Sequence, residues 1–406
     1  MRISEREQMT QMIDPSSGID ISSLSGTWGL IALVFGISIL LVFIIAIFAG
    51  YFRILYNIAS FASPVARAKA IGNPFLLREN MDQLIESKNL HEITSKMTDT
   101  GFLMGVEYEE DIIRIDRALK IAYYREYENL LTTVPDGIKP FFLAFRMVLE
   151  AEQVKSAIRG KFGRLSEDEL NKIIIPVGII TPETVARICR AQSLQDAILL
   201  LHETPYGSIL SESLESYSHS QSIFEMEWAL DLSVFRRISE SKIKVDSSLV
   251  GPVSEFIGLY SDIMNIKTLI RAKREHWSPE IISRFFVPGG AHYKEWRLVQ
   301  LYENPQIQDI VNQLTGSDYY RVLEPQIPSY EGSGSLHSFE TALDTMMLEK
   351  ISSISSVYHL TGGPLIKFIM GKFIETKNIR AVIYGISRGI SPEKIKEYVV
   401  CAGGPT

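Results

Sequence analysis

Glu150-Ala-Glu-Gln153-Val-Lys155 is the first of three stretches that repeat one pattern, and the other two are Asp262-Ile-Met-Asn265-Ile-Lys267 and Glu375-Thr-Lys-Asn378-Ile-Arg380. Each stretch, which we call a signature, reads acid, two spacers, amide, aliphatic residue and base. The second signature begins 112 residues after the first, and the third begins 113 residues after the second. This agreement indicates a triplicated unit and a pseudo-threefold body. We therefore expect function to follow from shape rather than from a catalytic pocket.

The residues around the signatures repeat as well. A proline precedes each signature and suits the first turn of a helix, where its missing N–H has no partner to lose. A serine follows each signature and suits a helix N-cap, and a stop begins nine residues further on. The repeated positions are Pro140, Pro252 and Pro364, then Ser166, Ser278 and Ser391, then the stops that begin at Ile175, Val287 and Val400.

Apolar residues recur at helical spacing, as Val253, Phe256 and Tyr260 do after the second proline. Period-two alternation is scarce, so the sequence predicts an all-α fold. It contains three similar helical domains, preceded by one N-terminal transmembrane helix. The predicted segments are an extracytoplasmic tail (1–26), the transmembrane helix (27–52), domains 54–178, 179–290 and 291–406, and an exposed loop from Gln326 to Ser338 in the third domain.

Composition excludes several classes of function. The net charge of −7 argues against nucleic-acid binding, which requires a basic surface. Cys189 and Cys401 lie far apart and predict no disulfide framework, and the seven histidines show no metal-ligand spacing. The Gly-Gly pairs at 289–290 and 403–404 are not followed by Gly-Lys-Ser/Thr, so they predict no phosphate-binding loop. We expect no metal, no cofactor, no small-molecule substrate and no catalytic activity.

The apolar segment near the N-terminus predicts a membrane span. Residues 27–52 hold 26 residues without a charge, and as a helix they would be roughly 39 Å long, enough for a hydrocarbon core of ~30 Å. The alternative is a cleaved signal peptide, whose apolar region is usually shorter and follows a basic start. Here the preceding residues are net acidic, whereas Arg53, Arg67 and Lys69 follow the segment. The positive-inside rule puts the bulk of the chain on the cytoplasmic face of the cell membrane.

The signature residues allow two interpretations. The acid and the amide are three positions apart and share one face of a helix. They either connect neighbouring helices of one domain or form a polar cluster at an interface with another protein. Recurrence in three domains with different surroundings favours the internal role. The residues concerned are Glu150, Gln153, Lys155, Asp262, Asn265, Lys267, Glu375, Asn378 and Arg380.

Five further cations are candidates for an interface. They are either solvated, or they form a cationic rim that pairs with acidic groups of a partner protein. Exposed ion pairs contribute ~0–1 kcal/mol each, so such a rim would set register more than affinity. The five residues are Arg159, Arg271, Lys273, Arg274 and Arg388.

The chain resembles the C subunit of archaeal A-type (A/V-type) rotary ATP synthases, a relative of the d subunit of V-ATPases. The matching stretches are Asp262–Lys273 (DIMNIKTLIRAK), Val287-Pro-Gly-Gly290, Glu375–Tyr384 (ETKNIRAVIY) and Ala66-Arg-Ala-Lys69 leading into Leu76-Leu77. The resemblance covers about residues 56–404 and implies a funnel-shaped, three-domain part of the central rotor. Such a protein sits on the cytoplasmic face of the membrane proteolipid ring and receives the central shaft in its hollow. It transmits torque during ATP synthesis or ion pumping and catalyses nothing.

The transmembrane helix departs from that family, whose members are ordinarily peripheral. Either the helix runs through the lumen of the proteolipid ring, or it is an extension absent from the working protein. A second hypothesis for the whole chain is a membrane-anchored helical adaptor that docks another complex.

Overall fold

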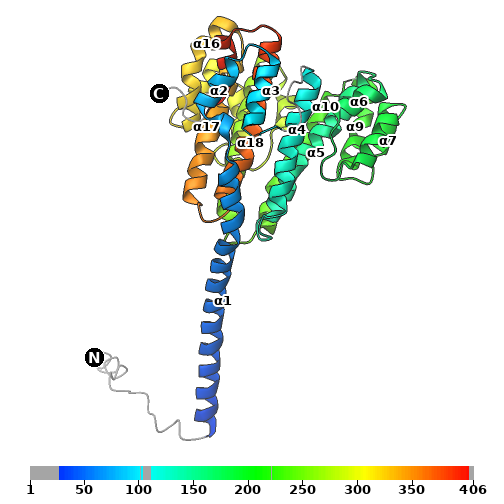
Figure 1. Cartoon of the computed structure of the whole chain (residues 1–406). Helices are drawn as coiled ribbons and strands as arrows, with labels where there is room; N and C mark the ends of the chain where they lie inside the picture. Colours follow the sequence, from blue (N-terminus) through cyan, green and yellow to red (C-terminus); the bar gives the residue numbers. More distant parts are fainter. Residues whose placement is uncertain (1–26, 101, 104–110, 221, 402–406) are drawn as a thin grey trace, which may run out of the picture. The chain divides into compact units, whose positions relative to one another are not determined.

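The computed structural model describes residues 27–100, 102–103, 111–220 and 222–401, and every regular element in these ranges is a helix (Figure 1). One isolated bridge, between Val177 and Ile180, is the strand-type pairing found in them. The predicted all-α class is therefore confirmed. The predicted tail 1–26 and the pair Gly403-Gly404 lie outside the described residues.

The chain divides into two compact units, residues 1–59 and 60–406. Helix α1 (Thr27–Ile71) begins in the first unit and continues past the predicted end of the span at Phe52. Among the described residues, α1 is the one helix long and apolar enough to cross a membrane, judged by length and composition. Its final turns belong to the second unit, where Phe61 and Val65 join the hydrophobic core.

Three helical hairpins form the framework of the second unit. They are α4–α5 (Ile112–Leu131, Lys139–Phe162), α10–α11 (Phe224–Ser241, Val250–Arg274) and α17–α18 (His337–Val357, Gly363–Ser387). The hairpins begin 112 and then 113 residues apart, and they end at the same spacing. Each signature lies in the second helix of a hairpin, and each of the three prolines lies in the first turn of that helix.

Shorter helices complete the unit, and three of them, α6, α12 and α19, begin at the same spacing of 112 and then 113 residues. Ser166, Ser278 and Ser391 are the N-caps of α6, α12 and α19, and Ser166 forms a capping box with Glu169. These shorter helices are η2 (Pro74–Leu76), α2 (Arg78–Ile85), α3 (Leu90–Asp99), α6 (Glu167–Ile173), α7 (Pro182–Arg190), α8 (Leu194–Leu199), α9 (Gly207–Ser220), η3 (Lys242–Lys244), α12 (Pro279–Ile282), η4 (Ser283–Phe285), α13 (Glu295–Tyr302), α14 (Ile307–Asn312), α15 (Asp318–Leu323), η5 (Glu324–Gln326), α16 (Ile327–Ser333) and α19 (Pro392–Lys396).

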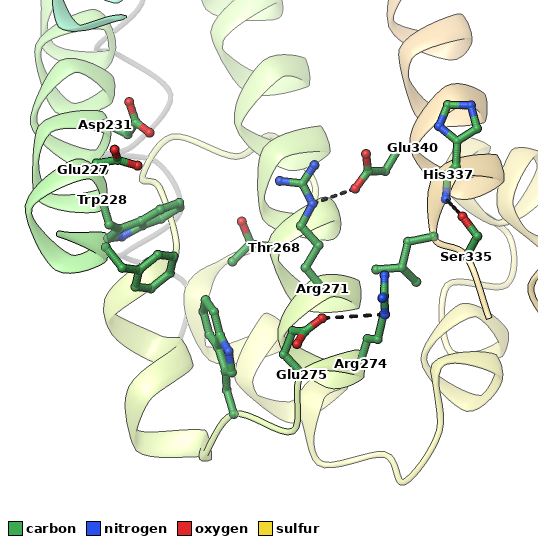
Figure 2. Close-up of a pocket in the computed structure, with 13 residues that line it drawn as sticks. Glu227, Trp228, Asp231, Thr268, Arg271, Arg274, Glu275, Ser335, His337 and Glu340 are labelled. Carbon is green, nitrogen blue, oxygen red and sulfur yellow. Dashed lines mark hydrogen bonds and ion pairs between the residues drawn. The ribbon is translucent and has the colours of Figure 1, made fainter. Parts of the chain in front are cut away.

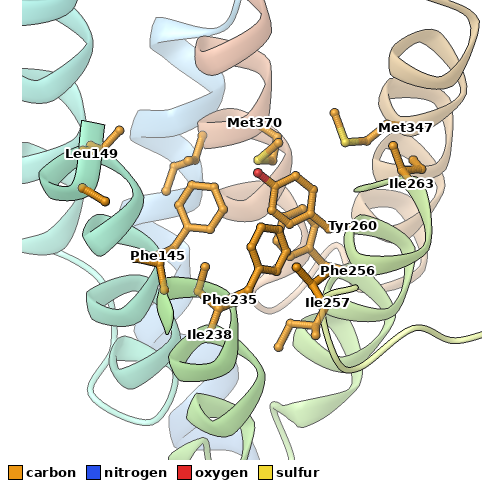
Figure 3. Packing of buried hydrophobic residues seen from close by; sticks show 14 of the residues in the cluster. Phe145, Leu149, Phe235, Ile238, Phe256, Ile257, Tyr260, Ile263, Met347 and Met370 are labelled. Atoms are coloured by element: carbon orange, nitrogen blue, oxygen red, sulfur yellow. The ribbon is translucent and has the colours of Figure 1, made fainter. Parts of the chain in front are cut away.

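The main core lies where the hairpins meet (Figure 3). Phe256 on α11 stacks on Tyr260 with ring centroids 5.5 Å apart and meets Phe145 of α5 at 6.0 Å. Met347 of α17 and Met370 of α18 extend into the same cluster. A second, smaller cluster joins residues between 75 and 119 to residues between 379 and 401. The beginning and the end of the second unit therefore share a core of their own.

The prediction of a loop from Gln326 to Ser338 is wrong over most of its length. Residues 327–333 form α16, and α17 already begins at His337. Pro328 stands in the first turn of α16, where it favours a helix rather than interrupting one. Gly334 ends α16 with a positive φ of 66°, which is the usual conformation of a glycine after a helix.

Candidate functional site: polar clusters between helical hairpins

The signature amides fasten the segments that follow each hairpin. The side-chain oxygen of Asn265 accepts a hydrogen bond from the Val287 N–H (2.8 Å), and its amide nitrogen donates to the Val287 carbonyl (2.9 Å). Asn378 makes the same two bonds with Val400, at 2.9 and 2.6 Å. Both asparagines are buried. Each one satisfies the two main-chain polar groups of a buried residue, which would otherwise lack partners.

Gln153 divides the same task between two partners. Its side-chain oxygen accepts a hydrogen bond from the Ile175 N–H (2.7 Å), and its nitrogen donates to the Tyr124 hydroxyl (2.6 Å). The amide contacts in all three signatures therefore reach a residue 22 positions further along the chain. This residue is the first of each predicted stop.

The second signature acid, Asp262, is fully buried and has four polar partners around it. It accepts hydrogen bonds from the main-chain N–H groups of His292 (2.9 Å) and Tyr293 (3.2 Å) and from the Tyr319 hydroxyl (3.1 Å), and it lies 3.1 Å from the His292 ring. A side chain at Gly290 would put its Cβ 2.4 Å from the carboxylate. The close approach explains the glycine that ends the Val-Pro-Gly-Gly stop.

The first signature acid, Glu150, has a similar environment. It accepts hydrogen bonds from the Tyr206 hydroxyl (2.7 Å), the Arg146 side chain (3.0 Å) and the Ile179 N–H (3.3 Å). In both signatures a tyrosine hydroxyl and a main-chain N–H from the next part of the chain reach the carboxylate.

The third signature acid, Glu375, receives its main-chain partner from the other end of the unit. The Phe75 N–H donates to Glu375 at 2.7 Å, although 300 residues separate the two. In place of a tyrosine hydroxyl, the buried ammonium of Lys372 binds Glu375 (2.8 Å) and lies 4.6 Å from the Phe102 ring centroid. Burial raises the pKa of Glu375 even though this lysine opposes the shift. The three acid contacts therefore form a closed cycle.

The signature bases form a second cycle of contacts. Each base binds an aspartate in the first helix of the following hairpin, and the third base returns to the first hairpin. We call the three contacts interface 1 (α5 with α10), interface 2 (α11 with α17) and interface 3 (α18 with α4). Their ion pairs are Lys155 with Asp231 at 2.8 Å, Lys267 with Asp344, and Arg380 with Asp116.

Two interfaces carry another ion pair one helical turn away. Arg159 donates two hydrogen bonds to Glu227 (2.6 and 2.9 Å) at interface 1, and Arg271 binds Glu340 (2.6 Å) at interface 2. The structure thus places Arg159 and Arg271, two candidates for an external cationic rim, in pairs within the chain. The corresponding positions of interface 3 hold Tyr384 and Ile112, which cannot form an ion pair.

The other three rim candidates also contact groups of this chain. Lys273 donates to the Tyr302 carbonyl (2.9 Å), and its ammonium lies over the Tyr302 ring. Arg274 lies 3.7 Å from the Glu275 carboxylate, and Arg388 lies near the Tyr384 ring. Arg274 and Arg388 are both exposed, so these two candidates remain accessible to solvent.

A pocket of about 500 Å³ lies beside interface 2 (Figure 2). Trp228 lies across it from Arg271 and Glu340, and Arg274 with Glu275 lies at its lower edge in this view. Its charged groups are engaged in ion pairs within the chain, which suits a structural contact rather than chemistry on a substrate. No group of three or more potential metal ligands occurs among the described residues.

Acid is expected to weaken interface 2. Burial alone would raise the pKa of Asp344, but the ammonium groups of Lys267 and Lys377 outweigh burial and hold this pKa below its ordinary value. A lowered pKa stabilises the fold above the unfolded-state value of about 3.9, and this stabilisation is lost as the pH falls through the folded-state value. Urea unfolding should therefore show Asp344→Asn less stable than the natural chain at pH 6, with the difference shrinking below about pH 4.

The control for this prediction is Asp231→Asn at interface 1. Burial raises the pKa of Asp231 despite its pairing with Lys155, so the natural aspartate should gain stability as the pH falls through this raised pKa. The two variants should therefore differ in the sign of their pH dependence. An identical pH dependence in both variants would contradict the lowered pKa of Asp344 and the raised pKa of Asp231.

Comparison with known proteins relates the chain to one family. The family model described as ATP synthase (C/AC39) subunit matches residues 64–398. The A-type ATP synthase C subunit of Methanocaldococcus jannaschii is 27% identical over 352 residues, covering 86% of this chain and 88% of the relative. The protein of the same name from Pyrococcus abyssi is 26% identical over 377 residues, covering 92% and 98%.

Proposed function

The chain belongs to the ATP synthase (C/AC39) subunit family, and on this basis we propose that it is the central-rotor coupling protein of an A/V-type ATPase. It links the central shaft to the membrane proteolipid ring and transmits torque during ATP synthesis or ion pumping. Membership makes it a structural, non-catalytic subunit of a membrane-associated rotary complex. The match over residues 64–398 is the observation that carries the proposal.

The contacts within the second unit support a role in transmitting force. A compliant protein between shaft and ring would deform and absorb part of the torque, whereas a close-packed interior has low compressibility. Here the signature residues bind neighbouring helices of the same chain instead of facing another protein, so they stiffen the second unit. In this proposal the domains are 54–178, 179–290 and 291–406, and the equal spacing of the hairpins supports that division.

Apolar side chains at the turns of two hairpins are candidates for contact with the ring. Ile243, Val357 and Leu360 are among the most exposed apolar residues of the second unit. Two hydrogen bonds show that the turns of the hairpins lie near one another. The Asp246 N–H in the second turn donates to the Gly137 carbonyl in the first (2.8 Å), and the Tyr358 hydroxyl in the third turn donates to Glu255 near the start of α11 (2.6 Å). Exposed apolar groups gathered at one end favour a protein partner there.

Residues 27–52 anchor the protein in the membrane in this proposal, with the second unit on the cytoplasmic face. Arg53, Arg67 and Lys69 after the apolar segment support that orientation. A helix that turns with the rotor must lie near its axis, since a helix outside the ring would strike the stator. The segment therefore occupies the lumen of the proteolipid ring.

Crosslinking tests the position of the helix. Leu40 lies within the apolar segment and its side chain is exposed, so a photoreactive residue there should capture a protein of the proteolipid ring. If only the membrane protein of the stator were captured, the position in the lumen would be refuted. Such a result would leave the coupling role intact.

Copurification tests the coupling role itself. Purified from its own membranes, the chain should appear at one copy per complex together with the proteolipid and the shaft proteins. The apolar helix favours a second candidate, a membrane-anchored adaptor that docks another complex. Recovery of the chain with unrelated partners, and without proteolipid, would support the adaptor and reject the rotor role.

A further inference from the structure

We infer that interface 3, between α18 and α4, is a joint that opens without unfolding the main core. Opening separates a front segment (the described residues 73–100, 102–103 and 111–119) from an end segment (residues 379–401). The joint is a property of the fold itself and goes beyond the proposed coupling role.

Chain connectivity sets interface 3 apart. The Lys155–Asp231 and Lys267–Asp344 pairs join hairpins that follow each other in the chain, with 76 and 77 residues between the partners. The Arg380–Asp116 pair spans 264 residues. The cycle is thus closed at interface 3 by non-covalent contacts between the two ends of the unit. No loop between successive hairpins supports interface 3, so its closure depends on these contacts and on the main core, where the Tyr123 ring of α4 lies 6.5 Å from the Phe373 ring of α18.

The two helices of interface 3 are also joined by fewer ion pairs than those of interfaces 1 and 2. Interfaces 1 and 2 each have a second ion pair, whereas Tyr384 and Ile112 occupy those positions here. The Arg380 side chain is 41% exposed, compared with 8% for Lys155 and 12% for Lys267. Water therefore reaches the Arg380 guanidinium more readily than the ammonium groups of Lys155 and Lys267, and it screens this pair more than the Lys267–Asp344 pair. The remaining polar contacts of the joint are the Phe75 N–H on Glu375, the Asn73 side chain on the Phe368 carbonyl (3.2 Å) and the solvent-accessible ion pair of Lys396 with Asp82 (3.3 Å).

The apolar contacts of the two segments form a cluster separate from the main core. Met81, Met97 and Leu119 of the front segment pack in this cluster with Ile379 and Val382 of the end segment. The aromatic residues at the centre of the hairpins belong to the other cluster. Proteins open in cooperative units that follow such divisions. The front and end segments can therefore part while the main core stays closed.

The two natural cysteines report on the two clusters. Cys401 is buried in the small cluster, and Cys189 is buried in the main core. In the full chain in detergent, a thiol reagent should modify Cys401 at the rate of joint opening and Cys189 at the slower rate of global unfolding. Variants with one cysteine each, made by Cys189→Ala and Cys401→Ala, assign the two rates. Modification should also depend less steeply on urea for Cys401, because less surface is exposed.

A thiol on the opposite side of the joint excludes simple fraying of the chain end. Met97 is fully buried in the front segment. In a chain carrying Met97→Cys, Cys189→Ala and Cys401→Ala, the introduced thiol should be modified at the same rate as Cys401. Modification at the rate of Cys189 would overturn the inference, because Cys401 alone would then be exposed by fraying.

The ion pair provides the matched perturbation. Arg380→Ala should raise the modification rate of Cys401 by about two- to fivefold, as expected for loss of a half-exposed pair, and leave the rate of Cys189 unchanged. Lys267→Ala at interface 2 should instead raise the rate of Cys189. Equal acceleration of both cysteines by Arg380→Ala would show that interface 3 opens only when the whole unit unfolds.

Discussion

Replacing Asp262 with alanine is expected to lower the free energy of unfolding by about 3–5 kcal/mol. The carboxylate is fully buried and satisfies two main-chain N–H groups, those of His292 and Tyr293, together with the Tyr319 hydroxyl. Alanine would leave the buried Tyr319 hydroxyl and the two part-buried N–H groups without this acceptor. Urea unfolding of the full chain in detergent, followed by tryptophan fluorescence, measures the loss.

Two variants separate this effect from loss of charge alone. Asp262→Asn keeps one acceptor oxygen and should be less destabilising than the alanine variant. Asp99→Ala removes an exposed acid and should change stability by less than about 0.5 kcal/mol. If Asp262→Ala were as mild as Asp99→Ala, the carboxylate would not be holding the loop that carries His292.

Phe256→Ala is the second substitution with a large expected effect, about 3–5 kcal/mol. The ring is fully buried and has aromatic neighbours from two helices, with Phe141 at 5.7 Å, Phe145 at 6.0 Å and Tyr260 at 5.5 Å. Truncation removes apolar contact and leaves a cavity that rigid hairpins on several sides cannot close. Thermal or urea unfolding of the full chain reports the change.

Size and position controls accompany this prediction. Phe256→Leu keeps most of the volume and should cost about 1–2 kcal/mol. Trp296→Ala removes a larger ring that is 70% exposed and should have little effect on stability. A similar loss for Phe256→Ala and Trp296→Ala would mean that the hairpins do not pack around Phe256 as described.

The framework of the fold was predictable because it is repeated. One weak helical pattern predicts little, but the same prolines and serines at the same spacing predicted where helices begin, and Pro140, Ser166 and Ser391 stand where expected. The loop from Gln326 to Ser338 was mispredicted for the opposite reason. Pro328 and Gly334 break helices in general, and only their positions at the start and end of α16 make them compatible with one.

The sequence indicated the signature residues but not their partners. Acid, amide and base could be recognised by spacing, whereas Asp116, Asp231 and Asp344 stand outside the signatures in helices of other hairpins. A signal for two of them was present, since Asp231 and Asp344 are 113 residues apart. The sequence around each signature base does not indicate whether the base binds an aspartate of the next hairpin or one of its own hairpin. That information lies in the packing of whole helices.

The direction of these contacts resembles head-to-tail assembly, with all three copies fused into one polypeptide. Each hairpin offers a base on one side and an aspartate on the other, so a hairpin released from its neighbours would carry two complementary faces. Such faces build rings when the rotation closes and filaments when it does not. Because Arg380 of the third hairpin binds Asp116 of the first, the cycle closes with three hairpins. All three belong to one polypeptide, so each complementary face is occupied within the chain and not by another molecule.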